Sequence, residues 1–194
     1  MSMGIDEFAV AVDAGLRQAG SALSAMLGQP VECRPEAARR VDEEAVRTAL
    51  GHWGDPVDAV CIDVDGGPGG TALLLFSADS CRELIGALTG EAAPQELGEM
   101  ERSVLAEVGN VTVTSFLNVL GEKAGSVTAP SVPAVVEAPL EVVLKRAEEA
   151  LHGDGEAGGP PWILCQAHFE AAGRRVLAHL AYLPQPARLE GEAG

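Results

Sequence analysis

Basic residues are scarce in this sequence of 194 residues. The 13 Lys and Arg side chains stand against 29 Asp and Glu, so the formal net charge is -16. A field of this sign repels nucleic-acid phosphates and anionic lipid surfaces, and we therefore expect no nucleic acid as partner. A basic protein surface is a better match, although acidity by itself also keeps a protein soluble.

The sequence also lacks the usual signals of metal sites, disulfides and membrane segments. Its cysteines, Cys33, Cys61, Cys81 and Cys165, form no CxxC pair, and its four histidines form no HxxxH or HExxH pair. We therefore expect no disulfide framework and no metal or other cofactor bound by this chain. No basic region precedes an apolar run at the N-terminus, and no uninterrupted apolar stretch approaches the ~18 residues of a membrane span. These features predict a cytoplasmic protein without membrane insertion.

One glycine-rich segment, Gly66 to Gly70, separates two β-prone runs at 59–65 and 71–76. A phosphate-binding loop would require GxxxxGKS, or GxGxxG at the start of a helix, and neither pattern is present. We interpret the segment as the turn of a hairpin with a long loop.

Apolar residues at helical spacing predict two long helices and two shorter ones. These helices are expected at 5–27, 77–88, 99–123 and 140–151. Further β-prone runs lie at 31–34, near 127, and at 132–136, 163–169 and 176–183, the last two forming a hairpin around Ala172 and Gly173. The acidic stretch 41–50 fits either a helix or a strand.

The hydrophobic content of 47% is sufficient for one sizeable core. Each long helix is followed by β-prone segments, which predicts an α+β fold of two pseudo-symmetric halves, with two long helices packed on a mainly antiparallel sheet. We expect a single domain over 1–185, with halves of about 1–90 and 91–185. A flexible loop at 152–161 and a flexible tail at 186–194 complete the chain.

The second long helix carries a polar stripe. At 100° per residue, Ser103, Glu107, Asn110 and Thr114 fall within about 40° of one line. The opposite side is mainly apolar and must pack on the sheet, so the stripe faces outward. Simple solvation would explain a lone Glu and Asn at such positions, but more than the pair is present.

Ser103 begins a longer pattern. Three residues separate it from Glu107, two separate Glu107 from Asn110, and 22 separate Asn110 from Pro133. A chance match of this kind is on the order of one in several hundred. The spacing resembles the signature of the CheC/CheX/FliY family of chemotaxis phosphatases, which has Asp or Ser, then Glu, Asn and Pro at these positions. The segments LIGALTGEAA (84–93) and ERSVLAEVGNV (101–111) also resemble that family, and the likeness covers about 5–185.

This resemblance implies a hydrolase that removes the aspartyl phosphate of a CheY-like response regulator. In such a site Asn110 orients the attacking water through its amide, and Glu107 docks on the regulator's active-site lysine. Ser103, Thr114 and Pro133 are expected to contact the partner or to shape the site. The Mg²⁺ that this chemistry needs is expected on the regulator.

The first long helix carries an altered copy of the same pattern. Asp6, Val10 and Asp13 stand at the spacing of the first three motif positions, and Pro35 comes one residue early. Val10 cannot carry charge, and the carboxylate of Asp13 would repel a phosphoryl group. We therefore predict one working site and one vestigial site.

Two other functions remain open. The protein could be a non-catalytic adaptor that binds a phosphorylated regulator, a CheD-like partner or a flagellar switch assembly. It could also be a scaffold with neither activity, which requires the motif to be a coincidence. The presence of both Glu107 and Asn110 favours catalysis.

Overall fold

The two longest helices occupy segments that repeat apolar residues at helical spacing and contain no proline. In the computed structural model, which describes residues 5–67, 69–152 and 162–185, α1 spans Ile5–Leu27 and α4 spans Glu99–Ala124. Of residues 5–7, 9 and 152 the backbone alone is described. Gly28 follows α1 with φ 66° and Gly125 follows α4 with φ 60°. Each helix thus ends at a left-handed residue, a conformation that favours glycine, and both predicted helices are confirmed.

The shorter helices begin at side-chain caps or after prolines. They are α2 (Glu43–Leu50), α3 (Ala78–Thr89) and α5 (Leu140–His152). The Asp42 carboxylate accepts a hydrogen bond from the backbone N–H of Ala45 at 2.8 Å, and the Ser77 hydroxyl accepts one from Ser80 at 3.1 Å. The stretch left open at 41–50 is therefore mainly helix.

The strands form one sheet in which every described pair is antiparallel. In the described part of the chain it has eight strands: β1 (Val31–Pro35), β2 (Arg39–Val41), β3 (Val57–Gly66), β4 (Gly70–Ser77), β5 (Thr128–Pro130), β6 (Ala134–Ala138), β7 (Trp162–Ala171) and β8 (Arg174–Pro184). Both predicted hairpins, β3 with β4 and β7 with β8, are confirmed. Val127 and Val132 lie outside β5 and β6 and are 87% and 88% exposed. β6 is therefore shifted by two residues from the predicted 132–136, and Pro133, which cannot donate to a ladder, directly precedes it.

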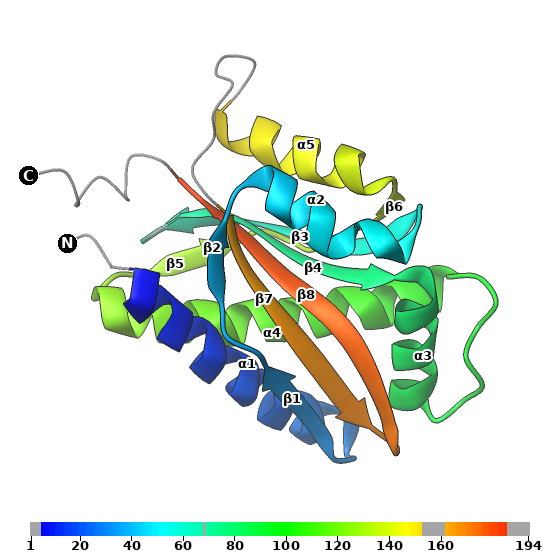
Figure 1. The fold of residues 1–194 in the computed structure, drawn as a ribbon. Coiled ribbons are helices and arrows are strands. Elements are labelled where there is room, and N and C mark those ends of the chain that lie inside the picture. The colour runs from blue at the N-terminus through cyan, green and yellow to red at the C-terminus, as the bar shows by residue number, and fades with distance from the viewer. Residues whose placement is uncertain (1–4, 68, 153–161, 186–194) are drawn as a thin grey trace, which may run out of the picture.

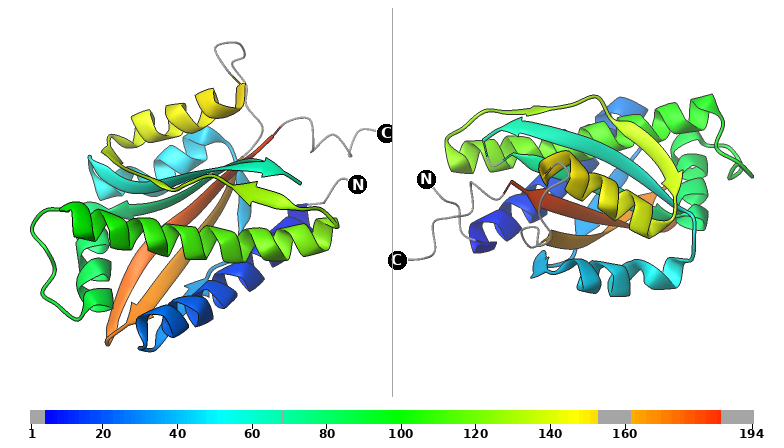
Figure 2. Two further views of the ribbon diagram at one scale, coloured as in Figure 1. Left: turned by 180° about the vertical axis from the view of Figure 1, so that it is seen from behind. Right: turned by 90° about the horizontal axis from the view of Figure 1, so that it is seen from above.

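The halves of the chain exchange their short strands. β1 and β2 of the first half pair with β7, and β5 and β6 of the second half pair with β3. The hairpins meet through β4 and β8 at the centre of the sheet. The helices α1, α4 and α3 cover one face, while α2 and α5 cover the other (Figures 1 and 2). The predicted α+β fold with pseudo-symmetric halves is confirmed.

Two glycines let the helices pack at very short distance. A Cβ at Gly15 of α1 would lie 2.3 Å from the Cα of Phe116, and one at Gly109 of α4 would lie 2.4 Å from Val60 Cγ1 on β3. Both distances are too short for real atoms, so α4 packs closely against both α1 and β3. This packing determines which side of α4 faces outward.

Some expectations are not addressed by the described residues. Residues 153–161 of the expected loop and the tail at 186–194 lie outside them. The division at about residue 90 into halves of one domain stays a prediction.

Candidate functional site on helix α4

The polar stripe predicted on the second long helix faces away from the sheet. Ser103 and Glu107 are exposed, and Asn110 and Thr114 are half-buried. On the opposite side of α4, Leu105, Val108, Thr112 and Phe116 are fully buried in the core. The structure therefore brings the four stripe residues together on one accessible helical face.

The Asn110 amide has a defined but weak contact. The Thr114 hydroxyl donates to Asn110 Oδ1 at 3.5 Å, one turn further along α4. A hydrogen bond of this length contributes little, since hydroxyl donors ordinarily lie about 2.7–2.8 Å from their acceptors. A water molecule or a partner group can therefore replace Thr114 at little cost.

Glu107 lies one turn before Asn110 and is exposed. Among the described residues no ion pair or hydrogen bond involves its carboxylate. An exposed carboxylate without an internal cation can accept one from a partner. Glu107 and Asn110 thus present a negative charge and a neutral amide side by side.

Pro133 lies in the short connection between β5 and β6, directly before β6. That connection is anchored on β3, because the backbone N–H of Ser131 donates to Asp63 O at 2.8 Å, and the N–H of Asp63 donates to the Ser131 hydroxyl at 3.0 Å. Both flanking strands lie against α4. The role expected for Pro133, shaping a loop beside the helix, stays a prediction.

The first helix presents a different surface at the related positions. Val10 is 55% exposed. Arg17 binds both carboxylate oxygens of Asp13, with Nε at 2.9 Å and Nη2 at 3.3 Å. Pro35 is the last residue of β1 and pairs with Ala167, while the side chain of Asp6 lies outside the described residues. The Asp13 carboxylate is thus held by a cation, an arrangement that i, i+4 spacing could have predicted.

A buried carboxylate near the start of α4 was missed by the sequence reasoning. Asp58 on β3 is only 3% exposed, and its Oδ1 has no hydrogen-bond partner among the described residues. Burial, and then the neighbouring Glu137, raise the pKa of Asp58, while a hydrogen bond from Cys81 and the charges of Arg102 and Arg82 oppose the shift. The available signal was the alternation of side chains along β3. Asp58, Val60 and Ile62 are spaced two residues apart and so lie on the same face of the strand, where all three are buried.

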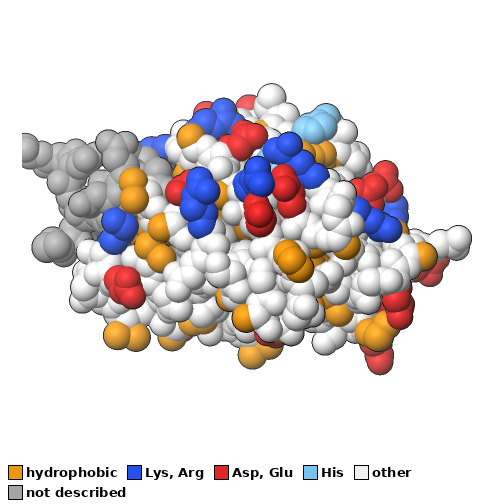
Figure 3. Space-filling model, turned by 90° about the horizontal axis from the view of Figure 1, so that it is seen from below, with side chains coloured by type: hydrophobic (Ala, Val, Ile, Leu, Met, Phe, Trp, Pro, Cys, Tyr) orange, Lys and Arg blue, Asp and Glu red, His pale blue; other side chains and the backbone are white. Residues whose placement is uncertain are grey.

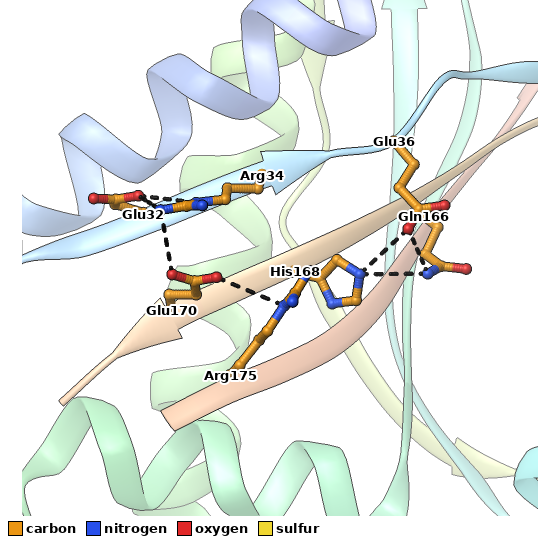
Figure 4. A network of polar contacts seen from close by, with 7 residues as sticks. All are labelled: Glu32, Arg34, Glu36, Gln166, His168, Glu170 and Arg175. Atoms are coloured by element: carbon orange, nitrogen blue, oxygen red, sulfur yellow. Dashed lines mark hydrogen bonds and ion pairs between the residues drawn. The ribbon is translucent and has the colours of Figure 1, made fainter. Parts of the chain in front are cut away.

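Another polar cluster lies on the opposite face of the sheet (Figure 4). It consists of Glu32, Arg34, Gln166, His168, Glu170 and Arg175 from β1, β7 and β8, together with Glu36, which directly follows β1. Its acidic and basic side chains pair with one another within the cluster. Arg34 binds Glu32 at 2.7 Å and Glu170 at 3.5 Å, and Arg175 binds Glu170 at 3.6 Å. Because acid and base neutralise each other there, we interpret this cluster as a solvated sheet face rather than a second site.

Charged side chains are unevenly distributed on the face seen from below in the orientation of Figure 1. Acidic and basic groups gather toward one side of it, and uncharged or apolar side chains cover most of the rest (Figure 3).

Helix α4 is also long and apolar enough, by length and composition, to cross a membrane. Half of its most apolar 18-residue window is buried inside the protein. Since it packs against α1 and β3 and carries the polar stripe, α4 has the character of a core helix.

Comparisons with known proteins place this geometry in context. No protein-family model matches the sequence, and no curated protein matches it. Solved structures do match. FliY from Thermotoga maritima has a TM-score of 0.70 at 15% identity, covering 98% of this chain and 95% of that one. The FliM middle domain from H. pylori has a TM-score of 0.64 at 12% identity, covering 93% and 94%. CheX in a complex with CheY, BeF3 and Mg²⁺ from Borrelia burgdorferi has a TM-score of 0.54 at 14% identity, covering 90% and 97%.

These likenesses define a class of protein. The chain has the fold shared by FliY, the FliM middle domain, a chemotactic CheC-like protein and CheX. The resemblance to the CheC/CheX/FliY family, inferred from the spacing of Ser103, Glu107, Asn110 and Pro133, is thereby confirmed at the level of the fold. At identities this low the likeness does not identify the activity.

Proposed function

We propose that this protein docks α4 on a phosphorylated CheY-like response regulator and hydrolyses its aspartyl phosphate. The observation that carries the proposal is the arrangement of Glu107 and Asn110. They lie one turn apart on the outward face of a helix that is packed tightly on β3, and Glu107 has no cation of its own among the described residues. Preorganised groups of this kind are what an acyl-phosphate phosphatase must insert.

In the proposed reaction water attacks phosphorus in line with the aspartyl oxygen. The bond between phosphorus and that oxygen breaks, which releases inorganic phosphate and restores the aspartate carboxylate. Asn110 accepts a hydrogen bond from the water through Oδ1, and its NH₂ group fixes the pose. The amide positions the water and does not deprotonate it. The long contact from Thr114, at 3.5 Å, leaves Oδ1 available for this role.

Glu107 holds the two proteins in register. Its exposed carboxylate pairs with the lysine of the regulator's phosphorylation pocket, one helical turn from the water that Asn110 orients. The regulator supplies Mg²⁺ to the phosphoryl oxygens. We further propose that the protein acts in the cytoplasm, where it would meet the regulator and any CheD-like partner.

Substitution of Asn110 tests the proposal. Asn110→Ala should slow regulator dephosphorylation by about 10² or more, while affinity for the BeF3-activated regulator stays nearly unchanged. The matched control is Asn118→Ala, an exposed asparagine two turns further along the same helix, which should leave the rate unchanged. The assay follows phosphoryl decay on regulators from the same organism. An unchanged decay rate with Asn110→Ala would remove Asn110 from the mechanism.

A second candidate function is that of a non-catalytic adaptor in a flagellar switch assembly. The likeness to the FliM middle domain supports it, because its TM-score of 0.64 exceeds the 0.54 of CheX. An adaptor would bind the activated regulator without accelerating phosphoryl decay. The assay above separates the two candidates.

A further inference from the structure

One cluster of charges lies directly beside the stripe and takes no part in the proposed chemistry. It is formed by Arg102, Glu137 and Asp58, where the start of α4 meets β6 and β3. Arg102 Nη2 binds Glu137 Oε2 at 3.1 Å, and Asp58 faces Glu137 across the antiparallel ladder. Arg102 immediately precedes Ser103, so the cluster adjoins the first position of the stripe.

This cluster is unfavourable for stability in three ways. Asp58 is buried with one oxygen lacking a hydrogen bond. Asp58 and Glu137 are like charges directly opposite each other on paired strands, an arrangement that destabilises a sheet. Arg102 is the fourth residue of α4, close to the helix N-terminus, where the dipole disfavours cations. Local arrangements that lower stability are typical of functional positions.

The guanidinium of Arg102 is presented to solvent and is not sequestered. The Arg102 side chain is 39% exposed and that of Glu137 is 47% exposed. Arg102 precedes Asn110 by two turns, which places it about 12 Å away along the helix and about 80° around it, on the side of β6. Ala106 lies between them, so no bulky side chain separates the two positions.

The expected partner is anionic on the surface that would face Arg102. A regulator that carries an aspartyl phosphate binds Mg²⁺ with further carboxylates, so the rim of its pocket carries negative charge. The net charge of -16 on this protein repels such a surface. A cation beside the stripe lowers that repulsion locally, and complementary charges determine which partners bind and how fast.

We propose that Arg102 is a docking residue that binds a carboxylate on the rim of the regulator's phosphorylation pocket and so determines which regulators are accepted. On docking, the partner carboxylate replaces Glu137 at the guanidinium, and Asp58 underneath retains the guanidinium at the surface. This inference rests on the proposed function for the identity of the partner, but it concerns binding and not hydrolysis.

A docking role for Arg102 and a purely structural role for its ion pair with Glu137 predict different effects of one variant, Glu137→Gln. If Glu137 competes with the partner, Glu137→Gln frees Arg102 and tightens binding. If the pair only joins α4 to β6, the same change leaves binding unaltered or weakens it. Arg102→Gln should weaken binding in the docking case, and Arg82→Gln is the matched control. Arg82 is on α3, is paired with Asp79 at 2.6 Å, and also acts on Asp58.

The experiment measures the affinity of the full chain and these variants for BeF3-activated receiver domains from the same organism, at low and moderate salt. We expect about tenfold weaker binding for Arg102→Gln, about two- to fivefold tighter binding for Glu137→Gln, and no change for Arg82→Gln. The effect of Arg102→Gln should shrink as salt increases. Urea unfolding of each variant verifies that the fold is intact.

The outcomes separate this inference from the proposed function. If wild type binds a receiver but Arg102→Gln and Glu137→Gln bind equally well, the role of Arg102 is wrong while hydrolysis can still be observed. If the affinities of the variants change as expected but no phosphate is released, the docking role of Arg102 is supported and the proposed phosphatase activity is wrong. If wild type binds no activated receiver, both are wrong.

Discussion

Acid should destabilise this protein through one buried histidine. His179 on β8 is only 4% exposed, its Nδ1 has no hydrogen-bond partner among the described residues, and its ring lies 4.9 Å from that of Trp53. Burial, followed by the charges of His52, Arg39 and His168, lowers the pKa of His179 to about 4. The unfolded chain takes up this proton near pH 6.5, whereas the native protein resists it until about pH 4.

The sign and size of the effect follow from linkage. Because the folded pKa is depressed, stability from neutral His179 is fully present above pH 6.5 and is lost as the pH falls toward 4. Each pH unit between these values costs about 1.4 kcal/mol, so the loss is about 1 kcal/mol at pH 5.5 and about 3 kcal/mol near pH 4. Asp58 has the opposite effect on stability at low pH. Because its pKa is raised in the native protein, the native state binds this proton more readily than the unfolded chain, so protonation of Asp58 favours the native state.

Urea unfolding followed by the fluorescence of Trp53 and Trp162 measures this loss. The free energy of unfolding is compared for wild type and His179→Gln at pH 7.5, 6.5 and 5.5. Groups common to both proteins, Asp58 included, cancel in the difference. The advantage of wild type over His179→Gln should shrink by about 1 kcal/mol between pH 7.5 and 5.5. A difference that stays constant over this range would refute the reasoning.

The remaining predictions concern the two long helices. Glu107→Lys should weaken docking and turnover together, because repulsion replaces attraction to the regulator's lysine; equal affinity of this variant for the activated regulator would exclude the docking role. Glu107→Ala combined with Asn110→Ala should abolish activity, while Asp13→Ala keeps it and titration saturates at one regulator per chain; two regulators bound per chain would show that the first helix also works. Gly109→Ala should lower the free energy of unfolding by about 1–3 kcal/mol, since the added methyl overlaps a buried valine on β3. The control Gly51→Ala, which meets nothing within 4 Å, should be nearly neutral, and equal denaturation midpoints for the two variants would contradict the packing argument.

Much of the secondary structure was predictable because its signals are local. The bounds of α1 and α4 follow from apolar periodicity and from Gly28 and Gly125, each within one turn of its helix. The same locality explains the stripe, since residues on one helical face are set by sequence spacing alone. Ser103, Glu107, Asn110 and Thr114 could therefore be grouped before any strand was placed.

The other features depend on which segments meet, and that is decided by packing between residues distant in sequence. The sequence left 41–50 undecided, and its helix forms where Val46 and Leu50 find an apolar surface shared with α5 and the sheet. Nothing local to β3 indicates that β5 and β6 pair with it, or that Asp58 is therefore buried opposite Glu137. Arg102 meets Glu137, 35 residues further along, only because α4 crosses β6. The sequence alone thus determined the composition of the stripe, whereas the tertiary structure determined the charges that surround it.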